Sequence, residues 1–198
     1  PDVIGFGRSH GPGTLPDVPT LAGVLARWVE GLARGPVHLV GHSMGGHLAI
    51  HLAAEHPGLL RRLVLADAAG IPRPLTPRTL LRLARASAPP RRWGDPAFLP
   101  VIWGDALAAG PFTALRGLSH ILRDDVRPLL PRITAPTLVV WGARDTLVPL
   151  EHGRRMRAKI PGARLLVVQG ACHNPMVDRA AAFNAAVVAF LDGAEVGE

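Results

Sequence analysis

One stretch of the chain decides the fold, Val37-His38-Leu39-Val40-Gly41-His42-Ser43-Met44-Gly45-Gly46. The apolar run at residues 37–40 leads into the pattern G-x-S-x-G, and a helical stretch at residues 48–56 follows before Pro57. Between a strand and a helix, this pattern places the serine on a sharp, strained turn with its hydroxyl exposed. Glycines two positions before and after the serine let strand and helix approach closely, which a Cβ would prevent. We therefore predict that Ser43 lies at a helix N-terminus, where exposed N–H groups favour an oxyanion.

Three further apolar runs indicate strands. They occupy residues 63–66, 137–141 and 165–168, and turn residues bound each of them. Short runs of this kind are typical of strands buried on both faces of a parallel sheet. Apolar residues recur at spacings of three and four over residues 21–32 and 183–191, as on one-sided surface helices. The alternation predicts an α/β fold with a doubly wound, mostly parallel sheet.

The middle of the chain follows a different pattern. From residue 71 to residue 136 no strand pattern is present and proline is dense. A helix is expected to begin at Asp95-Pro96 and to end at Gly110, with a kink at Pro100. We predict a core made of residues 1–70 and 135–198, with a helical insertion at residues 71–134.

Composition excludes several classes of protein. The chain has 198 residues, of which 48% are apolar, so it can bury a core and is not disordered. Cys172 is the single cysteine, which excludes a disulfide scaffold. No window approaches the ~18 uninterrupted apolar residues of a membrane span. A cytoplasmic location is our expectation, although any signal peptide would precede Pro1 and leave no trace in this sequence.

The charge of the chain is unevenly distributed. The net charge is +7, and residues 70–134 contribute +6 through ten arginines against four acids. A basic chain can bind nucleic acid or an anionic surface. No interleaved aromatic and basic residues accompany this charge, so we expect no nucleic-acid partner. The arginines are interpreted as a solvated helical face, with attraction of an anionic substrate as the alternative.

A serine is a weak nucleophile unless a base, itself held by a carboxylate, accepts its proton. Asp145 follows the run at residues 137–141, and His173 follows the run at 165–168. Parallel strands bring the residues that follow them to one edge of the sheet, so Ser43, Asp145 and His173 can converge. Asp67 also ends a strand, and we keep it as a rival for the role of the acid.

Two weaker patterns concern cofactors. His47, His51 and Glu55 recur every four residues on one helix face and could bind a metal ion. A solvated or packed face is the more common reason for such spacing, so we expect no metal. Gly5-Phe6-Gly7 lacks the third glycine and the preceding strand of a dinucleotide-binding loop, so we expect no cofactor.

Four stretches together resemble the α/β-hydrolase superfamily, in its cap-bearing branch of esterases, C–C bond hydrolases and haloperoxidase-like enzymes. They are GHSMGG at 41–46, WGARDTLVP at 141–149, HNPM at 173–176 with Phe183-Asn184, and PDVIGFGRS at 1–9. The first resembles the nucleophile elbow, the second the acid loop and the third the histidine loop with the final helix. The fourth resembles the loop after the family's fourth strand, and residues 71–134 then correspond to the family's variable cap.

The resemblance implies a serine hydrolase that needs no cofactor. Ser43 would be the nucleophile, His173 the base and Asp145 the acid, with the N–H of Met44 in the oxyanion hole. The substrate would be a small, hydrophobic, ester-like molecule, either a carboxylic ester or a compound with an activated C–C bond. A serine nucleophile argues against the dehalogenase and epoxide-hydrolase branches, which use aspartate. Neither the substrate nor the oligomeric state follows from the sequence.

The chain departs from the family at its beginning. Members carry further strands and a helix before the fourth-strand loop, so roughly 60 residues are expected to be missing. These residues would supply half of the oxyanion hole and would cover the strand at 37–40, which is otherwise an open apolar edge. A substitute loop at His10-Gly11-Pro12-Gly13 follows the wrong strand. The alternative prediction is a truncated, non-catalytic domain, or a fragment that needs its N-terminal part.

Overall fold

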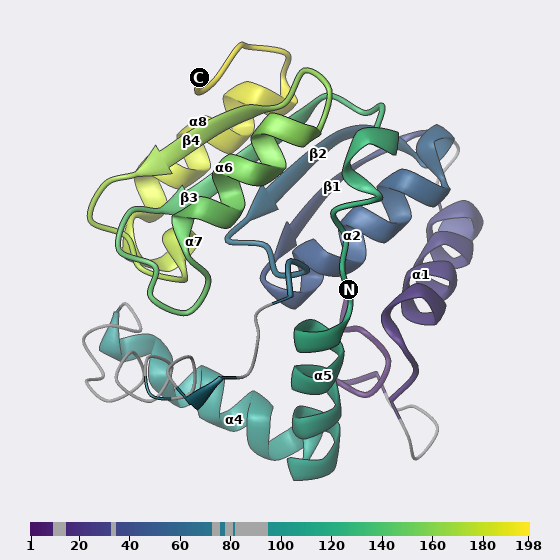
Figure 1. Ribbon diagram of the computed structural model, residues 1–198, viewed down its shortest axis with the longest axis vertical. Helices are drawn as coiled ribbons and strands as arrows, with labels where there is room; N and C mark the ends of the chain where they lie inside the picture. The colour runs from purple at the N-terminus through teal and green to yellow at the C-terminus, as the bar shows by residue number, and fades with distance from the viewer. Residues whose placement is uncertain (10–14, 33–34, 73–75, 78–80, 82–94) are drawn as a thin grey trace.

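Four parallel strands form the sheet of the computed structural model (Figure 1). The structure describes residues 1–198 except 10–14, 33–34, 73–75, 78–80 and 82–94. Within these residues the strands stand in chain order, with Val40 paired to Val64 and Val64 paired to Leu138. The strands are β1 (Val37–His42), β2 (Leu60–Ala66), β3 (Thr137–Gly142) and β4 (Arg164–Val168). The predicted α/β class and parallel sheet are confirmed.

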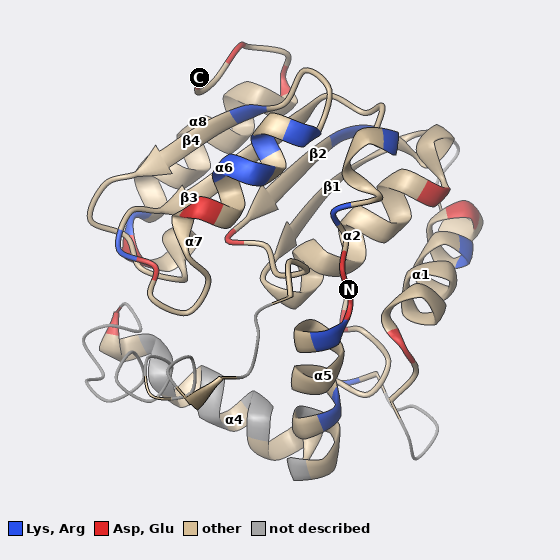
Figure 2. Ribbon diagram, in the orientation of Figure 1, with Lys and Arg blue, Asp and Glu red and all other residues tan. Residues whose placement is uncertain are grey.

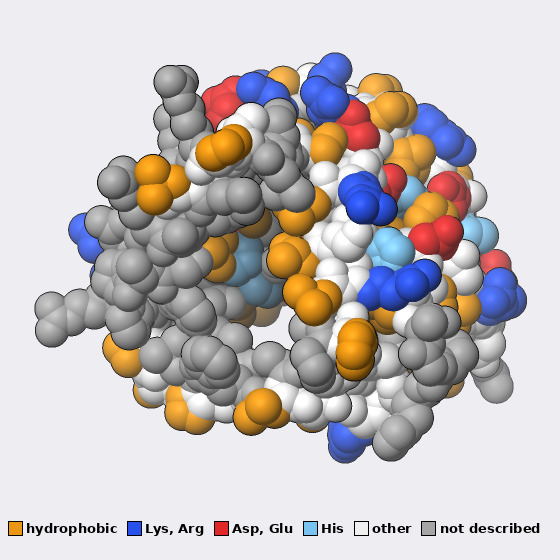
Figure 3. Space-filling view, turned by 60° about the horizontal axis from the view of Figure 1, so that its bottom comes forward, with side chains coloured by type: hydrophobic (Ala, Val, Ile, Leu, Met, Phe, Trp, Pro, Cys, Tyr) orange, Lys and Arg blue, Asp and Glu red, His pale blue; other side chains and the backbone are white. Residues whose placement is uncertain are grey.

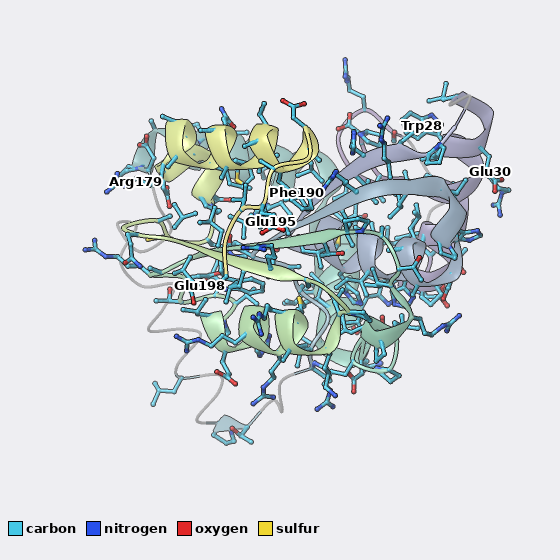
Figure 4. The ribbon with its side chains drawn as sticks, turned by 90° about the horizontal axis from the view of Figure 1, so that it is seen from above. Trp28, Glu30, Arg179, Phe190, Glu195 and Glu198 are labelled. Atoms are coloured by element: carbon cyan, nitrogen blue, oxygen red, sulfur yellow. The ribbon has the colours of Figure 1, made fainter. Side chains whose placement is uncertain are left out.

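Helices cover both faces of this sheet, as doubly wound folds require. On one face Leu65 and Val139 pack with residues of α2 (Met44–Glu55) and α6 (Leu150–Lys159). On the other face Val64 and Val140 pack against α8 (Ala180–Leu191), and Figure 4 shows α8 and α6 on opposite sides of the strands. Helix α1 (Val18–Leu32) packs on α2. Shorter helices of the core include η1 (Pro57–Leu59), η4 (Leu130–Arg132) and α7 (Pro175–Asp178).

The two edges of the sheet differ. At β4 the backbone groups of Leu165 and Glu198 exchange two hydrogen bonds, of 2.8 and 2.9 Å, so the C-terminal tail covers this edge (Figure 4). At β1, Val40 is 46% exposed and His38 is exposed, and β2 is the only partner strand among the described residues. The prediction that every strand is buried on both faces is therefore wrong for β1, whose second face no described helix covers.

Helix α6 shows how a very polar sequence still folds as a helix. It buries His152, Gly153 and Met156 and exposes its basic residues, which Figure 2 shows as a blue outer face. A Cβ on Gly153 would lie 2.6 Å from the ring of Trp141, so the glycine lets α6 approach β3 closely.

The segment expected to form the insertion contains helices and no strand among its described residues. Asp95 accepts a hydrogen bond from the N–H of Ala97 at 2.9 Å and begins the 3₁₀ helix η3 (Pro96–Phe98). Helix α4 (Leu99–Ala109) follows, so Pro100 lies within its first turn, at the junction between the two helix types. Gly110, at φ +79°, separates α4 from α5 (Pro111–Arg123). The division into core and insertion stays a prediction. No described helix is both long and apolar enough to cross a membrane.

The turn between β1 and α2 depends on two glycines. A Cβ on Gly41 would lie 2.6 Å from the carbonyl oxygen of Gly45, and one on Gly46 would lie 2.5 Å from the Cβ of Ala68. A Cβ on Gly45 would meet no atom within 4 Å. The predicted need for a glycine is thus confirmed at position 41 and wrong at position 45, where Gly46 makes the close approach instead.

Replacing Gly41 and Gly45 tests which of the two positions requires a glycine. Gly41→Ala is expected to lower the free energy of unfolding by about 1–3 kcal/mol, because its Cβ would overlap backbone atoms of the turn. Gly45→Ala is the matched control, with no loss expected and a gain of up to about 1 kcal/mol, since alanine favours helix over glycine. Urea unfolding measures both values, and equal losses in the two variants would contradict the assignment.

Candidate active site

Ser43 lies between β1 and α2 in a conformation that few non-glycine residues adopt. Its φ is +50° and its ψ is −115°. The Ser43 N–H donates to the Ala66 carbonyl oxygen at 3.1 Å, and the Ser43 carbonyl accepts from the N–H of Ala69 at 3.0 Å. A strained residue of this kind persists only where its surroundings fix it. Here the end of β2 fixes it, and the side chain is directed away from the sheet toward His173.

The structure brings all three residues of the predicted triad together. The Nε2 atom of His173 lies 3.0 Å from the Oγ of Ser43, and its Nδ1 lies 2.8 Å from the Oδ2 of Asp145. His173 is 9% exposed and the side chain of Asp145 is fully buried. The distances fit a serine O–H donating to Nε2 while the Nδ1–H donates to the carboxylate. The imidazole can therefore accept a proton from Ser43 and remain oriented.

Asp145 is fixed by its own loop. Its Oδ1 accepts hydrogen bonds from the N–H groups of Leu147 at 2.8 Å and Val148 at 2.9 Å. The indole N–H of Trp141 donates to the Val148 carbonyl at 3.0 Å, which ties the loop back to β3. With Oδ1 occupied by backbone donors, Oδ2 is left for His173.

Asp67, the rival acid, lies beside this pair and has a different role. It is fully buried, and its Oδ1 accepts from the N–H of Gly142 at 2.9 Å. Burial, and then the charge of Asp145, raise the pKa of Asp67 far above its usual range, so it holds its proton at neutral pH. Its Oδ2 meets no N–H or O–H donor, as an ionised oxygen would need.

His42 also contacts the triad, which no sequence pattern predicted. Its Nε2–H donates to the carbonyl oxygen of His173 at 2.7 Å, and the two rings lie 4.9 Å apart. Burial, together with the nearby His173, lowers the pKa of His42 to about 4, so the ring stays neutral and keeps a single donor. Its position immediately before the serine was the available signal, but a variable position of the motif carries no partner information.

Asp178 holds the loop that carries His173 in place. One of its oxygens accepts from the N–H of Cys172 at 2.7 Å, and the other accepts from the N–H of Asp95 at 2.8 Å. This carboxylate therefore connects the residue before His173 to the start of the helical segment. No sequence pattern indicated this connection, because Asp95 is far from Cys172 and Asp178 along the chain.

A cleft of about 340 Å³ opens at Ser43. Met44, Gly45, Phe6 and Val3 line it, and the space-filling view shows a hollow with histidine near its floor (Figure 3). The N–H of Met44 is the first of α2, so it has no acceptor within the helix. It therefore stays available beside the Ser43 hydroxyl. The possible substitute loop at residues 10–13 lies outside the described residues.

Among the residues that the structure describes, two groups of side chains are close enough to share a metal ion. One is Asp67, Asp145 and His173, whose polar atoms are already engaged with each other and with Ser43. The other consists of His47 and His51 with Asp124. The sequence suggested Glu55 as the third member, but its carboxylate lies 3.5 Å from the Nδ1 of His51, on the opposite side of the ring from Asp124.

Comparisons with known proteins agree with this fold. The model of the alpha/beta hydrolase family matches residues 1–186. The chain is 33% identical over 210 residues to the polyketide synthase ThaQ of Burkholderia thailandensis, which covers 95% of this chain and 10% of that protein. It is 31% identical over 211 residues to a poly(3-hydroxyalkanoate) depolymerase of Ectopseudomonas oleovorans, covering 96% and 73% respectively. A solved hydrolase from Pseudomonas aeruginosa PA01 has a TM-score of 0.81 at 30% identity, covering 98% of this chain and 78% of that one.

The chain belongs to the alpha/beta hydrolase family. The predicted family and fold class are therefore confirmed, and the hydrolase names among the relatives agree with the predicted class of enzyme. The chain spans a tenth of the length of ThaQ, in which it corresponds to one part of a much larger protein.

The pH dependence of stability tests the protonated state of Asp67. An unfolded aspartate ionises near pH 3.8, whereas folded Asp67 keeps its proton well above that value. The stability that this group contributes is therefore complete below about pH 4 and is lost as the pH rises toward the folded pKa, by at most about 1.4 kcal/mol per pH unit.

Asp67→Asn removes this titration while keeping the size of the side chain and one oxygen acceptor. We expect the variant to gain stability relative to the wild type at pH 8, with the gain shrinking toward pH 5. Urea unfolding at both pH values measures the difference, and Asp192→Asn, at an exposed position, is the control. A difference that is the same at both pH values would mean that Asp67 is ionised in the fold.

Proposed function

We propose that the protein is a serine hydrolase that cleaves carboxylic esters through an acyl-enzyme. The observation that carries this proposal is the unbroken hydrogen-bonded series from Ser43 through His173 to Asp145, at distances of 3.0 and 2.8 Å. The family and the hydrolase names among its relatives support the same class of reaction.

The first half of the reaction acylates the serine. His173 Nε2 takes the proton of the Ser43 hydroxyl while Oγ attacks the ester carbonyl carbon. The tetrahedral intermediate then collapses, the bond from carbon to the alcohol oxygen breaks, and the imidazolium gives its proton to the departing alcohol. Asp145 stabilises the positive charge of that imidazolium, and its two backbone donors keep it facing His173.

The second half releases the acid. A water molecule occupies the place that the alcohol has left, and His173 takes one of its protons as the oxygen attacks the acyl carbon. Collapse of this second intermediate breaks the bond to Ser43 Oγ, which recovers its proton from His173. The N–H of Met44 donates to the negatively charged oxygen in both halves, and each such donor contributes roughly 2.7–4 kcal/mol to the transition state.

The helical segment is proposed to cover the substrate. A Cβ on Gly117 of α5 would lie 3.5 Å from the Phe6 ring and 3.6 Å from the sulfur of Met44. Helix α5 thus lies against the residues that line the cleft, as a cap would. The apolar character of Phe6, Val3 and Met44 favours a small hydrophobic ester over a charged one.

A burst experiment tests the nucleophile. With a short-chain p-nitrophenyl ester, the wild type is expected to release one equivalent of p-nitrophenol before the steady state, and mass spectrometry should show one added acyl group. Ser43→Ala should lose the burst and lower kcat by at least roughly 10³-fold, because the remaining groups cannot form the covalent intermediate.

Controls separate chemistry from folding. Circular dichroism must show that Ser43→Ala is folded, and the exposed His38→Gln variant should retain the burst. Turnover that persists in Ser43→Ala would refute the assigned nucleophile. A folded wild type that is neither acylated nor active would instead support the non-catalytic domain or the incomplete fragment.

A further inference from the structure

We propose that His47, His51 and Asp124 form a binding site for a divalent transition-metal ion, with Zn²⁺ as the preferred occupant. The site lies outside the proposed catalytic residues, where α2 meets the end of α5. Its three ligand atoms, two imidazole nitrogens and one carboxylate oxygen, all lie within 4.8 Å of one another. Besides thiolate, imidazole and carboxylate are the groups that bind zinc in proteins.

The geometry directs all three side chains to one point. His47 and His51 are one turn apart on α2, so both rings lie on the same face of the helix. The Nε2 atoms of both rings lie 2.6 Å from a single oxygen, the Oδ2 of Asp124. Because the ligand atoms come from two different elements, an ion at this point would join α2 to the chain that leaves α5.

Burial favours a site over a solvated face. His47 has no exposed surface and His51 is 4% exposed, whereas the side chain of Asp124 is 31% exposed. The two imidazoles are thus held in place by the core, and the carboxylate lies at the opening through which an ion would enter. The Nδ1 of His47 is buried without a hydrogen-bond partner, and the Nδ1 of His51 lies 3.5 Å from a carboxylate oxygen of Glu55.

Only a small rearrangement would admit the ion. Tetrahedral zinc with bonds of about 2.0–2.1 Å separates neighbouring ligand atoms by roughly 3.3 Å, so each nitrogen–oxygen contact would widen by about 0.7 Å. Asp124 follows the last residue of α5 and is extended, with φ −78° and ψ 142°. A shift of this size can therefore be made by Asp124, because the chain that follows it is not helical.

His120 of α5 is the next histidine along the chain from this group. His120 lies one turn before Asp124, and its carbonyl accepts the Asp124 N–H at 3.0 Å. The Nε2 of His120 is buried and has no hydrogen-bond partner. The ring nitrogens of His120 are not among the ligand atoms that lie within 4.8 Å of one another, so we assign the fourth position to a water molecule.

Zn²⁺ titration of the full chain tests the proposal. After treatment with a chelator and dialysis, isothermal titration calorimetry with zinc chloride is expected to give one ion per chain and a rise in Tm. Asp124→Asn and His51→Gln should each weaken zinc binding at least tenfold. His38→Gln removes an exposed histidine and should change the affinity less than twofold. Mg²⁺ should not bind, because it prefers a set of oxygen ligands.

Three results would overturn the site: a wild type that binds no zinc, variants that bind zinc as tightly as the wild type, or an equal response to Mg²⁺. Should His51→Gln fail to fold by circular dichroism, Asp124→Asn decides the question, because it keeps the shape of the side chain and an oxygen acceptor. Zinc binding is measured without any substrate, so the outcome does not depend on the proposed hydrolase activity.

Discussion

The strained backbone of Ser43 is the constraint on which the site depends. Its positive φ is maintained because its N–H and carbonyl groups are both bonded to the chain at the end of β2, at Ala66 and Ala69. Those bonds require β1 and β2 to be parallel and in the observed register, and they require a glycine at position 41 so that α2 can turn back over the strand. The position of the serine hydroxyl is therefore set by pairing of strands and not by the serine's own preference.

Electrostatics then sets the protonation state of Asp67, a second buried carboxyl group beside the triad. Asp67 and Asp145 follow neighbouring strands and lie close together, and two negative charges at that spacing would repel strongly in a buried site. Asp145 has two backbone N–H donors and His173, whereas Asp67 has one donor, from Gly142. Burial, and then the nearby Asp145, raise the pKa of Asp67, so Asp67 holds its proton at neutral pH.

The sequence predicted the strands and the triad because both depend on local patterns. An apolar run followed by a turn marks each strand, and parallel pairing then brings the following residues to one edge. Contacts between distant residues left no such pattern. Asp124 contacts His47 and His51, which lie 77 and 73 positions before it in the chain. The exposure of Val40 and the crowding at Gly46 also depend on which neighbours pack there, so a motif could not reveal them.

Helix α2 connects the two sites of the molecule. Its first residue follows Ser43, and its next turns carry His47 and His51, which contact Asp124. Met44, at the start of the same helix, lies near Gly117 of α5. The helical segment therefore contacts α2 at the cleft and again one to two turns further along. Asp124 follows the last residue of α5 and contacts α2 through both histidines. An ion bound by His47, His51 and Asp124 would therefore hold the chain that leaves α5 against the helix that begins after Ser43.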